Sequence, residues 1–108
     1  MFGFRKLDVY RCALEALPLL FRLADRADSD IKRQLRRAVL SINLNIAEGT
    51  GRRDDDQRQF YRIARGSALE SAAVLDAMQA LGLATSDQIA PVEALLVRIV
   101  SMLTKMTG

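Results

Sequence analysis

The sequence predicts an all-α protein folded as an up-and-down four-helix bundle, with one domain spanning residues 1–108. Three observations predict this class. Apolar side chains recur every three or four residues in four successive segments, which is the period of a helix with one buried face. Glycine and proline, which disfavour helix, account for only six and two residues. The connections between the segments are short, as between antiparallel neighbours in helical bundles.

The four predicted helices cover residues 7–26, 30–48, 54–81 and 87–106. Each has an apolar face that we expect to be buried. In the first helix this face is Leu7, Tyr10, Leu14, Leu17, Phe21 and Ala24, widened by Ala13 and Leu20. In the second it is Ile31, Leu35, Ala38, Val39, Ile42 and Ile46. In the third it is Phe60, Ile63, Ala64, Ser67, Ser71, Val74, Leu75, Met78 and Leu81. In the fourth it is Ile89, Val92, Leu96, Ile99, Val100 and Leu103, widened by Leu95 and Met106.

Capping residues mark the ends of these segments. Asp28–Asp30 supplies N-cap chemistry for the second helix, and Thr85–Asp87 supplies it for the fourth. Gly49 follows the last apolar residue of the second helix, so we expect it at the left-handed position that ends a helix. We expect Asp54 to cap the third helix, with Gln57 in the spacing of a capping box.

Composition excludes several classes of function. The chain has no histidine and one cysteine, Cys12, which excludes an internal disulfide, a Cys/His zinc cluster and every catalytic scheme that needs an imidazole. No motif brings together a Ser/Lys pair or two carboxylates for catalysis. The run Asp54–Asp56 is explained by the positive end of a helix. We therefore expect no enzyme activity, no cofactor and no metal.

The sequence also indicates where the protein resides. Charged residues at positions 8, 11 and 15 interrupt any apolar signal segment, and no apolar run is long enough to cross a bilayer. An isolated thiol suits a reducing compartment. We expect a cytoplasmic protein with no membrane partner.

The second half of the second helix is apolar on two sides. At about 100° per residue, Leu40 and Leu44 point away from the expected buried face. They are either isolated exposed leucines, which are common on protein surfaces, or part of a subunit interface. The second interpretation predicts a homo-oligomer.

Positive charge is concentrated in the middle of the chain. Residues 31–65 contain nine Lys/Arg and four acids, a net +5 in a protein of net charge +3, so the remainder carries −2. Three arginines, at positions 58, 62 and 65, lie one helical turn apart and opposite the buried face. Arginine side chains suit phosphate oxygens. The candidate nucleic-acid-binding residues, which we expect to lie near one another, are Arg33, Arg36, Arg37, Arg52, Arg53, Arg58, Arg62 and Arg65.

Two functions remain open at this point. The first is non-specific binding of RNA or DNA by an oligomer, because several copies multiply weak contacts. The second is a structural or protein-interaction scaffold, in which the arginines pair with acids across a subunit interface. Glu48 and Glu70 are the candidate partners in that case.

The central stretch resembles a known family. Arg36-Arg37-Ala38, Ser41-Ile42, Asn45-Ile46-Ala47-Glu48-Gly49 and Gly51-Arg52 look like the signature of the four-helix-bundle proteins encoded in 23S rRNA intervening sequences. Further matches are Phe60, Ile63-Ala64, Gly66-Ser67, Glu70 and Leu81-Gly82. One departure is Asn43, which stands where the family usually has proline.

The resemblance implies properties beyond the fold. It implies a homopentameric barrel of bundles and, by analogy with related retroelement accessory proteins, nucleic-acid binding beside a reverse transcriptase. The stretch from Asn45 to Arg53 is not a phosphate-binding loop, because the glycine spacing is wrong and no lysine follows. We expect a turn there, with Gly49 and Gly51 shaping it and Asn45 and Glu48 anchoring it by hydrogen bonds.

Overall fold

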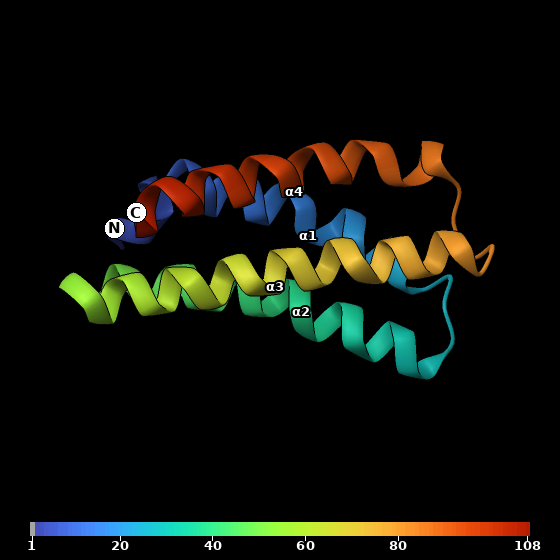
Figure 1. Cartoon of the computed structure of the whole chain (residues 1–108), viewed down its shortest axis with the longest axis horizontal. Helices are drawn as coiled ribbons and strands as arrows, with labels where there is room; N and C mark the ends of the chain where they lie inside the picture. Colours follow the sequence, from blue (N-terminus) through green and yellow to red (C-terminus); the bar gives the residue numbers. More distant parts are fainter. Residues whose placement is uncertain (1) are drawn as a thin grey trace.

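Four α-helices make up the fold of the computed structural model, which describes residues 2–108 (Figure 1). They are α1 (Asp8–Ala24), α2 (Ser29–Thr50), α3 (Asp54–Ala80) and α4 (Ser86–Thr107), preceded by the short 3₁₀ helix η1 (Gly3–Lys6). No strand occurs in the described residues. The all-α class with four helices is therefore confirmed.

Each helix packs against two others, in the order α1, α2, α3, α4 and back to α1. The bundle measures 42 × 26 × 23 Å. Both chain ends and the α2–α3 turn lie at the same end of the long axis, on the left of Figure 1. The α1–α2 and α3–α4 connections lie at the other end. This antiparallel arrangement decides which residues become neighbours.

Helices α2 and α4 bury the faces that the sequence predicts. Leu35, Ile42 and Ile46 of α2 are fully enclosed, as are Ile99 and Leu103 of α4. The caps of these helices also form as predicted: the Asp28 carboxylate accepts from the Ile31 amide, and Thr85 makes a reciprocal capping box with Gln88.

The predicted buried face of α1 is partly wrong. Leu14 is 45% exposed, whereas Ala13, Leu20 and Ala24 are buried as predicted. The helix also buries four residues outside the predicted face, which are Val9, Cys12, Ala16 and Leu23. Small side chains on this face allow α2 and α4 to approach closely, while the larger Tyr10 and Phe21 fill its margins. The Cys12 thiol lies in the core, 3.6 Å from the Leu95 carbonyl oxygen, and burial raises its pKa.

The predicted buried face of α3 is also partly wrong. Ile63 and Leu81 are exposed, whereas Tyr61 and Ala68 are buried in their place. Leu81 lies just beyond the helix, at its C-cap, so it no longer follows the helical period. Tyr61 can be buried because its hydroxyl reaches Thr50 Oγ1, 3.3 Å away.

Both predictions at the α2–α3 turn are wrong. Gly49 is helical without a positive φ, and α2 continues through Thr50 to a C-cap at Gly51. The N-cap of α3 is Arg53, whose side chain makes no capping bond. Asp54 begins the helix with a φ of +51°, a left-handed conformation that aspartate tolerates.

The side-chain amide of Asn43 is buried and makes no hydrogen bond to the described residues. Asn43 is only 7% exposed, and neither its amide nitrogen nor its amide oxygen has a hydrogen-bond partner in residues 2–108. On α2 it lies on the flank opposite Ser41 and Asn45, so the polar contacts between α2 and α3 do not reach it. An unpaired buried amide destabilises the folded state.

We predict that Asn43→Leu raises the free energy of unfolding by about 1–3 kcal/mol, because it removes that desolvation cost with a side chain of similar size. Urea denaturation measures the change. Asn45→Leu is the matched control and should lower stability, because the Asn45 amide is hydrogen-bonded. A loss of stability in Asn43→Leu would contradict the assignment.

Candidate functional site

Helices α2 and α3 approach each other closely where the turn between them begins, at Gly49. Gly49 is buried against Tyr61, and a Cβ built on Gly49 would lie 2.8 Å from Tyr61 Cε1 and 3.0 Å from Phe60 Cβ. Glycine is required here by this close approach and not by its conformation. The sequence offers no way to separate these two uses of glycine.

Side chains from α3 tie the turn down. Gln57 Nε2 donates to the carbonyl oxygens of Gly49 and Arg52, at 3.1 and 3.0 Å. Because a C-terminal helix carbonyl normally lacks a partner inside its helix, these bonds close the end of α2. The sequence predicts a capping box for Gln57, which is wrong, because its side-chain amide binds the carbonyl oxygens of the turn.

Arg52 forms a second tie across the same turn. Its guanidinium donates to Glu48 Oε1 at 2.8 Å and to Asp56 Oδ2 at 3.3 Å, and lies 5.1 Å from the centroid of the Phe60 ring. The hydrogen bond with Glu48, and next the charge of Asp56, raise the pKa of Arg52. Glu48 thus anchors the turn, as expected, and has a partner within its own chain.

Asn45 does not anchor the turn, so that expectation is wrong. Its amide donates to the Ser41 carbonyl oxygen and to Ser41 Oγ, at 2.8 and 3.0 Å. Ser67 Oγ lies 2.7 Å from Ser41 Oγ, and Ser71 Oγ donates back to the Ser67 carbonyl oxygen. Asn45 therefore belongs to a polar seam along the outside of the α2–α3 contact.

The eight candidate arginines do not lie together. Three of them, Arg33, Arg36 and Arg37, lie at the start of α2, whereas Arg52, Arg53, Arg58, Arg62 and Arg65 lie at or near the α2–α3 turn. From Arg36 to Thr50, the last residue of α2, the helix rises about 21 Å, at 1.5 Å per residue. Since α2 and α3 are antiparallel, the two groups occupy opposite ends of the bundle.

Most of these arginines have partners within the chain. Arg36 Nη2 lies 2.8 Å from Asp25 Oδ1, Arg33 pairs with Asp30, and Arg58 pairs with Asp55. Arg65 donates to Thr107 Oγ1 of α4 at 3.1 Å. Within the described part of the chain, no acidic partner lies within 4.0 Å of Arg37, Arg53 or Arg62.

The pairs near the α2–α3 turn are exposed to solvent. Arg58 and Asp55 are the example: the hydrogen bond from Arg58, followed by the charges of Arg58 and Arg62, lowers the pKa of Asp55. Exposed ion pairs contribute little to stability because water and salt compete for both partners. Such arginines can exchange a carboxylate for another anion.

The fold concentrates positive charge at one end. The half of the bundle that holds the α2–α3 turn and both chain ends consists of residues 2–15, 40–67 and 97–108. It carries ten Lys/Arg and six Asp/Glu, a net +4, whereas the other half carries six and seven, a net −1. We call the first half the basic end. Arg5, Lys6 and Arg11 belong to it, although the sequence places them about 40 residues from the α2–α3 turn.

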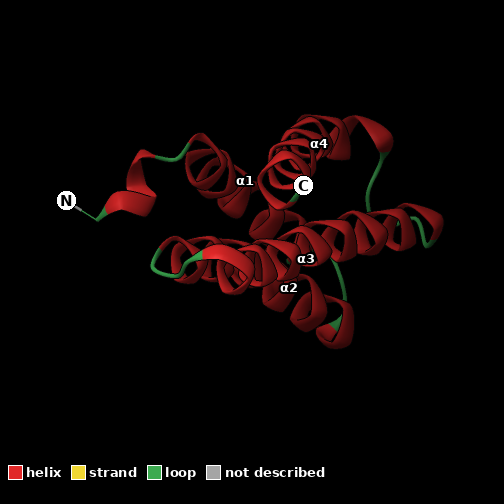
Figure 2. Ribbon diagram, turned by 60° about the vertical axis from the view of Figure 1, so that its left-hand side comes forward, coloured by secondary structure: helices red, strands yellow, loops and turns green. Residues whose placement is uncertain are grey.

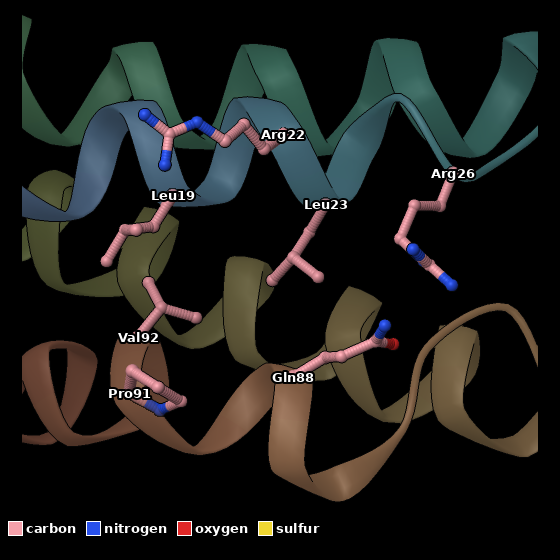
Figure 3. Close-up of a pocket in the computed structure, with 7 residues that line it drawn as sticks. All are labelled: Leu19, Arg22, Leu23, Arg26, Gln88, Pro91 and Val92. Atoms are coloured by element: carbon pink, nitrogen blue, oxygen red, sulfur yellow. The ribbon is translucent and has the colours of Figure 1, made fainter.

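A cleft of about 280 Å³ between α1 and α4 is a separate feature (Figure 3). Leu19, Leu23, Pro91 and Val92 line it with apolar surface. Arg26 lies at its edge near Gln88 and donates to the Leu83 carbonyl oxygen at 2.9 Å, while Arg22 points away from the apolar lining. The cleft therefore lacks a pair of converging cations that would fix an anionic ligand.

Two exposed apolar surfaces lie on different sides of the bundle. On α2, Leu44 is 66% exposed and Leu40 is 43% exposed, and on α3 Ile63 is 42% exposed. On the other flank of α3, Leu69 and Val97 border a groove of about 230 Å³ between α3 and α4. The two surfaces differ in shape and composition.

These features define an all-α, four-helix protein whose distinctive local structure is a tightly packed α2–α3 corner beside a basic end. The chain belongs to the family of 23S rRNA-intervening sequence proteins, which it matches over residues 5–105. The resemblance drawn from the central stretch is thus confirmed.

A solved structure shows the same fold. A protein of unknown function from the S23 ribosomal protein family of Bacteroides thetaiotaomicron superimposes with a TM-score of 0.86 at 20% sequence identity, covering 93% of this chain and 98% of that one. Among curated proteins, no sequence matches the chain. In residues 2–108, no helix combines the length and apolar character needed to span a membrane.

We predict that Gly49→Ala lowers the free energy of unfolding by about 1–3 kcal/mol, because its Cβ must displace Tyr61 from a packed site. Urea denaturation measures the loss. Gly51→Ala is the matched control. The nearest atom to its Cβ is the Glu48 carbonyl oxygen at 3.6 Å, so stability should change by less than about 0.5 kcal/mol. Equal effects at the two positions would contradict the close-approach explanation.

Proposed function

We propose that the protein is a non-enzymatic, self-associating helical bundle that binds RNA or DNA without sequence specificity at its basic end. The observation that carries the proposal is the charge asymmetry, +4 at the basic end against −1 at the other. A nucleic-acid backbone is a dense line of negative charge, so such a surface attracts it over several ångströms. We place this function in the cytoplasm, where the unpaired thiol suits the reducing conditions.

The available arginines support recognition of the backbone. Arg53 and Arg62 have no acidic partner in the described residues, and Arg58 has only an exposed one. Guanidinium groups bind phosphate oxygens through two parallel hydrogen bonds, and these contacts carry no sequence information. Binding of this kind depends on salt and tolerates any base sequence.

Self-association is the second part of the proposal. The α2 surface around Leu44 and the α3–α4 groove beside Leu69 are different surfaces on different sides of the bundle. Contact between unlike surfaces is heterologous, and repetition of one heterologous contact closes a ring when the rotation allows it. The family resemblance puts the number of copies at five. A ring would present several basic ends to one strand and raise the avidity.

A scaffold without nucleic acid is the alternative, and the exposure of Leu44 favours it equally. In that case the free arginines contact a neighbouring copy. Glu70 remains available for such a pair, whereas Glu48 already binds Arg52. A reverse transcriptase is the protein partner that the family resemblance adds if the gene belongs to a retroelement.

We predict that the double variant Arg53→Glu/Arg62→Glu weakens binding of single-stranded RNA by tenfold or more at about 50 mM salt. It should also flatten the slope of log affinity against log salt by about 1.4, since two phosphate contacts are lost. Fluorescence anisotropy of a labelled oligonucleotide measures both quantities.

The double variant Arg33→Glu/Arg37→Glu is the matched control, because it makes the same charge change at the opposite end. It should retain most of the affinity. Equal losses in both double variants would show that only net charge matters. If the unaltered protein binds no RNA at low salt, nucleic-acid binding is rejected and the scaffold function stands. If Arg62→Glu dissociates the oligomer, that arginine lies at a subunit contact.

We predict that Leu44→Glu converts the oligomer to a monomer while the fold persists, because a charge at an exposed position costs stability only in an interface. Light scattering coupled to size exclusion measures the mass, and circular dichroism checks the helices. Leu81→Glu, also exposed but at the other end of the bundle, is the control and should leave the mass unchanged. A monomeric unaltered protein would remove the ring.

A further inference from the structure

A column of three aromatic rings stands at the start of the chain. Phe2 stacks on Phe4 with ring centroids 5.6 Å apart and an interplanar angle of 18°. Phe4 in turn meets Tyr10 edge to face, with centroids 4.8 Å apart. Phe4 and Tyr10 are partly buried, but Phe2 is 65% exposed. The column therefore ends in an aromatic ring open to solvent.

A cation accompanies this column. The Arg5 guanidinium carbon lies 5.1 Å from the Phe2 centroid and 5.8 Å from the Phe4 centroid. Both distances fall within the range of cation–π attraction. Arginine beside an exposed aromatic ring is a combination that binds nucleobases, because both groups offer flat surfaces for stacking.

The short helix holds these groups in place. In η1 the Arg5 amide donates to the Phe2 carbonyl oxygen at 3.2 Å, and the Leu7 amide donates to the Phe4 carbonyl oxygen at 3.1 Å. Arg11 of α1 donates through Nε to the Arg5 carbonyl oxygen at 3.3 Å. The helix also packs against both α1 and α2. Phe2 is thus presented on a fixed support.

The column lies at the basic end. Figure 2 shows η1 and the α2–α3 turn on the same side of the molecule. Lys6 and Arg11 flank the rings along the chain, and Arg53 lies at the turn. Packing of the core explains Phe4, which touches Tyr10, but it does not explain Phe2, which stacks on Phe4 beside Arg5 and is 65% exposed.

We propose that Phe2 and Arg5 form a stacking platform for one unpaired base of a single-stranded nucleic acid. This inference rests on the proposed function, and it narrows the ligand to single strands, because bases inside a duplex are already stacked on one another. The backbone of the bound strand contacts the arginines of the basic end, while one base lies against the exposed part of the Phe2 ring. Stacking tolerates every base, so the platform adds affinity without sequence specificity.

The test uses the absence of tryptophan from the chain. Phe2→Trp introduces a single tryptophan at the platform, whose emission is distinguished from that of the two tyrosines. Oligo(dT) of about 20 nucleotides should quench its emission, while an abasic strand of equal length and charge should not. The unaltered protein should bind oligo(dT) roughly tenfold more tightly than the abasic strand, as one stacked base provides.

Phe2→Ala should remove that difference. Its affinity for oligo(dT) should fall to that for the abasic strand, with an unchanged salt slope, because no phosphate contact is lost. Leu81→Ala, which removes another exposed apolar side chain at the opposite end, should change neither affinity.

The outcomes separate the two proposals. Salt-dependent binding that is the same in Phe2→Ala and the unaltered protein overturns the platform and leaves the proposed function standing. Failure of the unaltered protein to bind either strand at low salt overturns both. A Phe2→Ala variant that changes mass in light scattering overturns the platform by assigning the rings to a contact between copies.

Discussion

The contact of Gly49 with Tyr61 sets the relation between α2 and α3, and much of the structure depends on it. With no Cβ at Gly49, the two helices approach closely at their shared turn. The same register brings Ser41 against Ser67 two helical turns away from Gly49. Gln57 of α3 then closes the turn by donating to the Gly49 carbonyl oxygen. A wider spacing would break the seam and the turn together.

The antiparallel pairing that follows decides where charge accumulates. The 22 residues of α2 rise about 33 Å, so arginines at its two ends cannot serve one surface. The ends of α1 and α4 instead bring their own charges to the turn. The basic residues in the middle of the sequence are therefore separated by the fold. Those near the α2–α3 turn lie at the same end of the bundle as the first residues of the chain.

Strong periodicity explains what the sequence could predict. In α2 and α4 the longest apolar stripe is also the buried one, so their buried faces follow from the pattern, as the Thr85 cap does from its own residues. In α1 the apolar residues spread over a wide part of the helix surface. The pattern therefore favours large side chains such as Leu14, whereas the structure buries small ones such as Cys12 and Ala16. Gly49 satisfies either of two physical demands, a left-handed turn or a close approach, and only neighbours in space distinguish them. The basic end depends on tertiary proximity that no local pattern contains, and the stacking of Phe2 on Phe4 depends on the backbone geometry of η1.

The proposed activities use separate parts of the surface. Self-association would employ the sides of α2, α3 and α4, where Leu44 and Leu69 are exposed. Nucleic acid would approach the end of the bundle, where the α2–α3 turn and η1 lie. Because the sides of the helices and the tip of the bundle point in different directions, a ring could form without covering the α2–α3 turn and η1. Repetition around the ring would then place stacking and phosphate contacts at regular intervals, which suits a flexible single strand better than a rigid duplex.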